Sequence, residues 1–377
     1  MDVLCDTLLL EEILPRLPPK CLLRLGATSR RYNALACSPG FAARYWHRAG
    51  VFLQRADEEQ REGAPALPRF LAAAAAPACQ AAAAAELVPG AGLAEDGTAI
   101  VHSAAGLLLC SRGSTRRTLR YYVCNPVTRQ RTALPELRNL CYEPQCGLFT
   151  VADDGRGAAT RFQVVVIEEC QMEDIYPSLP FEHDFLRPPP VPGKSGTAYW
   201  IQRTDDEAIA YHSASNSLRV IRLPERHVGG RSNRCIGERH GGGGLRFART
   251  DSSALEVWDS ETMEGHAWVL AHRVAITELL GQKSDATWHH CRIKPIGFHP
   301  TDVDVVFLAL PAGVAAYSIE HGTMNLQCKH NCFVTRAVMF PYVHPTCPLQ
   351  IPANKSSALA LPQKRKADES YSKNQTS

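Results

Sequence analysis

The chain has 377 residues, 45% of them hydrophobic, so it has room for two or three domains and can bury a sizeable core. Its formal net charge of +3 is small for this length and argues against a surface built to neutralise nucleic acid. No run approaches about eighteen uninterrupted apolar residues and no secretory signal pattern opens the chain, so we expect no membrane span and no secretion. The fourteen cysteines are then expected as reduced thiols in the cytoplasm or nucleus.

Short amphipathic helices are predicted at the N-terminus. Apolar residues recur at three-to-four-residue spacing between Leu9 and Leu17, which places them on one face of a helix. Pro18 ends this helix, because the Pro18-Pro19 pair cannot continue the hydrogen-bond ladder. A second helix is expected near Leu22, and a third over 41–52 after a Ser-Pro-Gly turn signal. The apolar positions are Leu9, Leu10, Ile13, Leu14, Leu17, Leu22, Leu23 and Leu25.

A helical unit of about forty residues is too small to bury a full core of its own, so its apolar stripes are expected to need a partner. An ordinary helical cap packed on the rest of the same chain is the alternative. Periodicity alone does not separate the two.

The sequence of this unit resembles a known module. The run LLLEEILPRLPPKCLLRL, followed by TSRRYN and SPGF, resembles an F-box over residues 4 to 48. The family pattern differs in having proline where Cys5 stands, tryptophan where Tyr32 stands, and one leucine fewer before Glu11. The resemblance implies docking on the Skp-type adaptor of cullin ubiquitin ligases. The residues expected partly in the module's own core and partly against the adaptor are Leu9, Ile13, Leu14, Leu17, Pro18, Leu22, Leu23 and Leu25.

Residues 51–97 are predicted to be a linker. Residues 54–66 are charged and lack apolar periodicity. An alanine-rich stretch over 69–87 follows, which has little to bury and is interrupted by Pro77. A linker or surface insertion is expected here, with a marginal helix as the alternative.

From residue 98 the pattern changes to short β-type runs bounded by turn residues, which indicates an antiparallel sandwich, barrel or propeller. Three stretches (120–135, 209–224 and 314–329) share a β run with tyrosine, a polar turn and a second β run. Such a repeated hairpin is typical of propeller blades, with a non-repeating β-sandwich as the alternative. The expected strands are 99–101, 106–110, 119–124, 161–167, 198–202, 208–212, 217–223, 245–248, 254–258, 267–270, 303–308 and 314–319.

The same region carries a second resemblance. The runs GLLLCS, YYVCNPVTRQRTALP, FQVVVIE, GTAYWIQ, LEVWD, IGFHPTDVDVVFL and VMFPYVHP resemble the F-box-associated region of large plant F-box families. This resemblance implies a β-propeller-like, substrate-binding domain over 98–350. The tail 351–377 has few large apolar residues and is expected to be disordered, with a short basic cluster at 364–366 that could serve nuclear import.

Candidate chemical sites give weak signals. The consecutive His289, His290 and Cys291 would alternate between the faces of a strand, so they are poorly placed to converge on one metal. Cys328, His330 and Cys332 have no second ligand pair at zinc-site spacing. The four glycines at 241–244 lack the Lys-Ser or Lys-Thr of a phosphate-binding loop. We therefore predict no catalytic residue, no metal and no cofactor.

These observations predict an α+β multidomain chain with a helical F-box at 1–50, followed by an all-β domain that we expect to be a propeller. The expected function is that of a substrate-recognition subunit of an SCF-type cullin ubiquitin ligase, not an enzyme. Its partners would be a Skp-type adaptor, cullin through it, and a protein substrate whose binding residues stay unknown. No nucleic-acid or membrane partner is expected. The alternatives are a propeller scaffold outside any ligase and, by fold analogy alone, an enzyme with its site in a propeller funnel.

Overall fold

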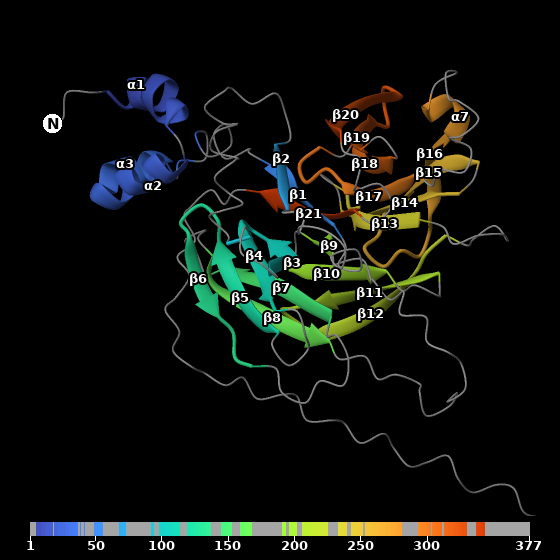
Figure 1. Cartoon of the computed structure of the whole chain (residues 1–377), viewed down its shortest axis with the longest axis horizontal. Helices are drawn as coiled ribbons and strands as arrows, with labels where there is room; N and C mark the ends of the chain where they lie inside the picture. The colour runs from blue at the N-terminus through green and yellow to red at the C-terminus, as the bar shows by residue number, and fades with distance from the viewer. Residues whose placement is uncertain are drawn as a thin grey trace, which may run out of the picture.

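Twenty-one β-strands in six antiparallel sheets make up most of the described chain in the computed structural model (Figure 1). The described residues are 5–17, 19–36, 38, 41, 49–55, 68–72, 92–93, 98–113, 119–136, 145–152, 159–167, 191–193, 196–201, 206–224, 233–239, 243–251, 253–280, 293–302, 304–310, 313–329 and 337–343.

Each sheet is named here by a letter. Sheet A contains β1 (Ala49–Arg55), β2 (Arg69–Ala72) and β21 (Ala337–Val343). Sheet B contains β3 (Thr98–Ala104), β4 (Leu107–Arg112), β5 (Arg120–Asn125) and β6 (Gln130–Ala133), and sheet C contains β7 (Gln145–Ala152) and β8 (Ala159–Ile167). Sheet D contains β9 (Val191–Pro192), β10 (Thr197–Ile201), β11 (Glu207–His212) and β12 (Ser217–Arg222). Sheet E contains β13 (Asn233–Glu238), β14 (Leu245–Thr250), β15 (Ala254–Ser260) and β16 (Val269–Ala275), followed by helix α7 (Ile276–Leu279). Sheet F contains β17 (Lys294–Phe298), β18 (Val305–Leu310), β19 (Gly313–Ser318) and β20 (Thr323–Lys329).

The sheets follow one another as the blades of a β-propeller. Sheets B, D, E and F are meanders of four consecutive strands, sheet A has three strands, and sheet C has two within the described residues. A separate apolar cluster lies between each pair of neighbouring sheets, so the core is divided into wedges around the ring. The propeller prediction is confirmed, and the sandwich alternative is wrong.

The ring closes by pairing strands from distant parts of the chain. In sheet A, β1 pairs with β21 over seven residue pairs, from Ala49 opposite Val343 to Arg55 opposite Ala337. The buried side chain of Gln54 then ties this sheet to sheet B, because its Oε1 accepts from the Ile100 N–H at 2.7 Å. Closure therefore combines a full strand ladder with a buried side-chain bond.

The predicted repeat corresponds to the outer hairpin of a blade. The three repeats form β5–β6, β11–β12 and β19–β20, the third and fourth strands of sheets B, D and F. In all three turns the last residue before the fourth strand has a positive φ: 61° at Arg129, 49° at Asn216 and 63° at Gly322. The shared polar turn of the sequence thus places a residue with positive φ at the same position in all three hairpins.

A side-chain bond fixes each of these turns. The last residue of the third strand accepts a hydrogen bond from the backbone N–H three positions later. The acceptor and donor residues are Asn125 with Thr128 at 3.2 Å, His212 with Ser215 at 3.3 Å, and Ser318 with His321 at 3.2 Å.

Two expectations about the N-terminal half are wrong. Residues 49–52, expected at the end of a third helix, belong to β1, and residues 69–72, expected in a linker, form β2. The run Val51-Phe52-Leu53 is buried on both faces of sheet A, in the clusters shared with sheets F and B. A short continuous apolar run of this kind is equally compatible with a buried helix and a buried strand, so periodicity misassigned it.

Several expectations fall outside the described residues: His289, His290, Cys291, His330, Cys332, the glycines 241–242, most of the alanine-rich stretch and the tail 351–377. No helix in the described part of the chain has the length and apolar character needed to cross a membrane.

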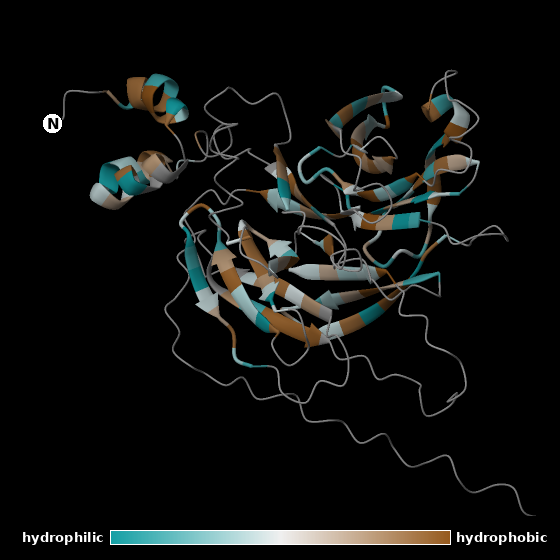
Figure 2. Ribbon diagram, in the orientation of Figure 1, coloured by the Kyte–Doolittle hydropathy of each residue, from teal (hydrophilic) through white to brown (hydrophobic). Residues whose placement is uncertain are grey.

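Short helices form the N-terminal segment. They are α1 (Asp6–Leu8), the π-helical η1 (Leu9–Ile13), the 3-10 turn η2 (Leu14–Arg16), α2 (Pro19–Thr28) and α3 (Arg30–Ala36). Figure 2 shows both hydrophobic and hydrophilic residues on them, as expected of amphipathic helices. The break between η2 and α2 falls at the predicted proline pair.

Candidate functional site

The N-terminal helices, here called the helical module (residues 5–41), pack around a small apolar core. Leu9, Leu14 and Leu22 are buried there, together with Ala36 and Phe41. Three of the eight predicted adaptor-binding residues therefore hold the module together and are not available to a partner.

The other predicted contact residues lie nearer the surface. Ile13, Leu17 and Leu25 are half-buried at the edge of the module's core, and the neighbouring Leu8 is 41% exposed. Pro18 and the side chain of Leu23 lie outside the description. Leu8, Ile13, Leu17 and Leu25 thus each keep part of their apolar surface exposed.

A π-helical turn lies within the leucine-rich start of this segment. Residues Leu9–Ile13 form π-helix, in which hydrogen bonds span one residue more than in an α-helix. Leu9 and Leu14, five positions apart, both reach the core in this way. An ion pair between Arg31 Nη2 and Asp6 Oδ1 at 2.7 Å links α3 to α1 on the outside.

A cleft of about 400 Å³ lies on the β domain, between β16–α7 of sheet E and β19–β20 of sheet F. Val274, Leu279 and Tyr317 contribute to it from the apolar cluster between these sheets. His272 Nε2 and the Tyr317 hydroxyl are hydrogen-bonded across the cleft at 2.9 Å. The remaining lining residues are Arg273, Glu278, Leu280, Gly322 and Met324.

Burial and nearby carboxylates set the charge state of this pair. Burial lowers the pKa of His272 below its ordinary value, while Asp304 and Glu278 act in the opposite direction. Burial raises the pKa of the Tyr317 phenol, and the same two carboxylates raise it further. At neutral pH the cleft therefore offers a neutral imidazole and a protonated phenol, which are hydrogen-bonding groups, beside two carboxylates.

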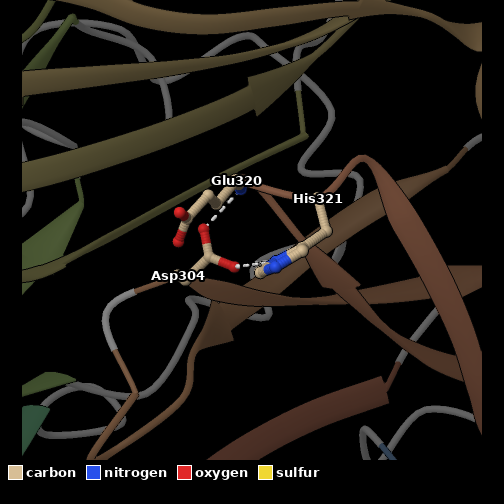
Figure 3. A group of neighbouring side chains, drawn as sticks. All are labelled: Asp304, Glu320 and His321. Carbon is tan, nitrogen blue, oxygen red and sulfur yellow. Dashed lines mark hydrogen bonds and ion pairs between the residues drawn. The ribbon is translucent and has the colours of Figure 1, made fainter.

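Asp304, Glu320 and His321 form a cluster of possible metal ligands at the edge of sheet F (Figure 3). One carboxylate oxygen of Asp304 accepts from the backbone N–H of Glu320, and the other accepts from the Ser318 hydroxyl. The Asp304 Oδ2 also lies 3.8 Å from His321 Nδ1. Asp304 is thus already engaged in fixing the β19–β20 turn, and the cluster gives no independent sign of a metal.

A second charged group lies on the face of sheet E that points away from the cleft. Glu256 and Arg249, each with a side chain only 6% exposed, form an ion pair at 2.7 Å. Arg273 approaches the same carboxylate from the solvent side, with 3.6 Å between its Nε and Glu256 Oε1. The Arg249 guanidinium also lies 5.6 Å from the centre of the Trp258 ring.

The cleft residues were not singled out by their sequence pattern. They come from β16, α7, β19 and β20, between positions 272 and 324, and share no motif. Only the packing of sheet E against sheet F brings them together.

Comparisons with known proteins add little to this geometry. No protein-family model matches the chain, and no curated protein matches it. Among solved structures, a chain of the nidogen/laminin complex aligns with TM-score 0.39 and 9% identity, covering 79% of this chain and 99% of that one. Virginiamycin B lyase from Staphylococcus aureus aligns with TM-score 0.34 and 14% identity, covering 62% and 71%. AztD from Citrobacter koseri aligns with TM-score 0.29 and 12% identity, covering 64% and 61%. At these scores the similarities carry no argument, and the propeller assignment rests on the chain's own sheets.

Proposed function

We propose that the chain is a substrate-recognition subunit of an SCF-type cullin ubiquitin ligase. The helical module would dock on a Skp-type adaptor, and the propeller would hold a protein target. The observation that supports this most is that apolar side chains of the helical module stay partly exposed, in a chain that also contains a propeller. The sequence resemblance of both parts to F-box proteins points the same way.

Docking on this model is driven by apolar burial. Leu8, Ile13, Leu17 and Leu25 would lose their remaining exposed area to the adaptor, at about 25 cal/mol per Å² before the costs of association. The proposed mechanism is proximity and needs no catalytic residue of this chain. A bound target is held beside the ubiquitin-charged enzyme, which raises its effective concentration.

The test is binding of the purified full chain to a purified Skp-type adaptor, measured by calorimetry. We expect a dissociation constant of about 1 μM or tighter, which corresponds to about −8 kcal/mol. Leu8→Asp and the double variant Ile13→Asp/Leu17→Asp are both expected to abolish binding. Leu8→Asp is the cleaner of the two, because Leu8 is 41% exposed and is not part of the module's core.

A matched control places the same change on the propeller. Leu218 and Val220 on β12 are 61% and 55% exposed, so Leu218→Asp/Val220→Asp changes two apolar side chains without touching the module. This control should bind the adaptor like the unmodified chain. If the folded, unmodified chain does not bind, the ligase proposal is wrong and a propeller scaffold outside any ligase takes its place.

A further inference from the structure

The cleft between sheets E and F is lined by apolar and polar groups in about equal measure. Val274 and Leu279 are buried in the cluster between the sheets, and Leu280 and Met324 pack on it half-buried. The volume of about 400 Å³ falls within the range of about 300–1,000 Å³ that is usual for ligand sites. The aliphatic part of a ligand side chain can therefore enter the cleft and be removed from contact with water.

Two carboxylates lie in or near the cleft. Glu278 lines it, and Asp304 lies near enough for both carboxylates to act on His272 and Tyr317. Within the described residues one cation, Arg273, also belongs to the lining. Its strand neighbours His272 and Val274 point toward sheet F, so Arg273 points to the opposite face, where it faces Glu256.

A cleft that has an apolar wall, the Glu278 carboxylate in its lining and the Asp304 carboxylate nearby is complementary to a side chain with an aliphatic stem and a positive end. Lysine and arginine have this construction, burying the stem while the charged group stays near polar partners. An acidic side chain would meet Glu278 and Asp304 as like charges, which disfavours it. The uncharged His272 and Tyr317 pair adds hydrogen-bonding capacity without adding positive charge.

We propose that this cleft binds a lysine or arginine side chain presented by an extended segment of another protein. The proposal deepens the substrate-holding role proposed for the propeller, and rests on it for its biological meaning. The binding itself requires no adaptor. Failure of adaptor docking and failure of this site are therefore separate results.

The experiment uses the full chain with ¹³C-methyl methionine, because Met324 lies in the cleft and the chain has five methionines. The Met324 signal is assigned with Met324→Leu. The probes are uncharged glycine–serine octapeptides with lysine, arginine, norleucine or glutamate at one central position. We expect the lysine and arginine peptides to shift the Met324 signal saturably, while the signal of Met339, buried between sheets A and F, stays in place.

Norleucine keeps the aliphatic stem but lacks the charge, so its peptide should bind more weakly, and the glutamate peptide should not bind. Glu278→Gln should weaken lysine-peptide binding about twofold to fivefold, as expected for one exposed charge pair. Glu261→Gln, which removes an exposed carboxylate from the β15–β16 turn, should leave the affinity unchanged. The proposal is overturned if millimolar lysine peptide leaves Met324 unmoved, or if glutamate and lysine peptides shift it equally.

Discussion

Removing Arg249 should destabilise the propeller strongly, because it leaves a buried carboxylate short of its main partner. In the folded chain Arg249 donates to Glu256 through Nε at 2.8 Å and approaches it with Nη2 at 2.7 Å. Arg249→Met keeps most of the side-chain volume but removes the charge. Breaking one side of a buried ion pair costs about 3–5 kcal/mol. The exposed Arg273 lies 3.6 Å from Glu256 and still partly neutralises its charge when Arg249 is absent. We therefore expect the loss in the free energy of unfolding to lie at the lower end of this range, about 3 kcal/mol.

The matched double variant separates the pair from simple loss of packing. Arg249→Met/Glu256→Leu removes both charges, and replacing a whole buried pair with apolar residues is often close to neutral. We therefore expect the double variant to be more stable than Arg249→Met alone. The assay is urea unfolding followed by tryptophan fluorescence, with circular dichroism as a second probe of the same transition. If Arg249→Met costs less than about 1 kcal/mol, or if the double variant is the less stable of the two, the buried-pair reasoning is wrong.

Three further changes test other parts of the fold. Gly322→Ala should cost about 1 kcal/mol because φ is 63° there, whereas Arg129→Gly, at φ 61°, should be neutral or slightly stabilising; equal effects in urea unfolding would contradict the shared turn. Burial lowers the pKa of His102 from 6.5 to about 3, so only the unfolded state takes up this proton between pH 6.5 and 3. Stability from His102 is thus complete above pH 6.5 and falls by up to about 1.4 kcal/mol per pH unit below it, and His102→Gln should flatten that slope in a pH series of unfolding curves. Burial raises the pKa of Cys146 to about 12, so iodoacetamide should label the exposed Cys5 in the native chain and leave Cys146 unlabelled in a mass-spectrometric digest.

Much of the β domain was predictable because its strands and turns are encoded locally. The strand over 208–212 and its partner over 217–223 are joined by a polar turn, and both match β11 and β12 closely. The hairpin signal is visible in three copies because each turn has a residue with positive φ at the same position and a side-chain bond to the backbone at the same spacing. Turns and strands that depend on neighbouring residues can be predicted from the sequence without knowing which strand packs against them.

What escaped prediction depends on contacts between distant residues. β1 is held as a strand by β2 on one side and by the distant β21 on the other, and nothing within Ala49–Arg55 itself distinguishes a strand from a buried helical turn. The cleft depends on two neighbouring sheets packing together, so its residues leave no pattern in the sequence. In the helical module, the π-helical turn brings Leu9 and Leu14 to the same core at a spacing that a 3.6-residue period does not describe.

The pairing of β1 with β21 also limits when the propeller can close during synthesis of the chain. The β1–β2 pair needs only residues 49 to 72, but a ribosome must release the chain as far as residue 343 before β21 can complete sheet A. Until then the residues of β1, sheet B and sheet F that pack against β21 in the finished fold stay exposed. An incomplete ring of this kind is prone to misassembly and to cleavage by proteases. The helical module uses contacts within some forty residues and has no such delay. A stop codon just before Ala337 would remove only a small part of the chain, but it would remove β21. The two apolar clusters that join sheet A to sheets B and F would then lose the residues that β21 supplies, while the other four clusters would keep all of theirs.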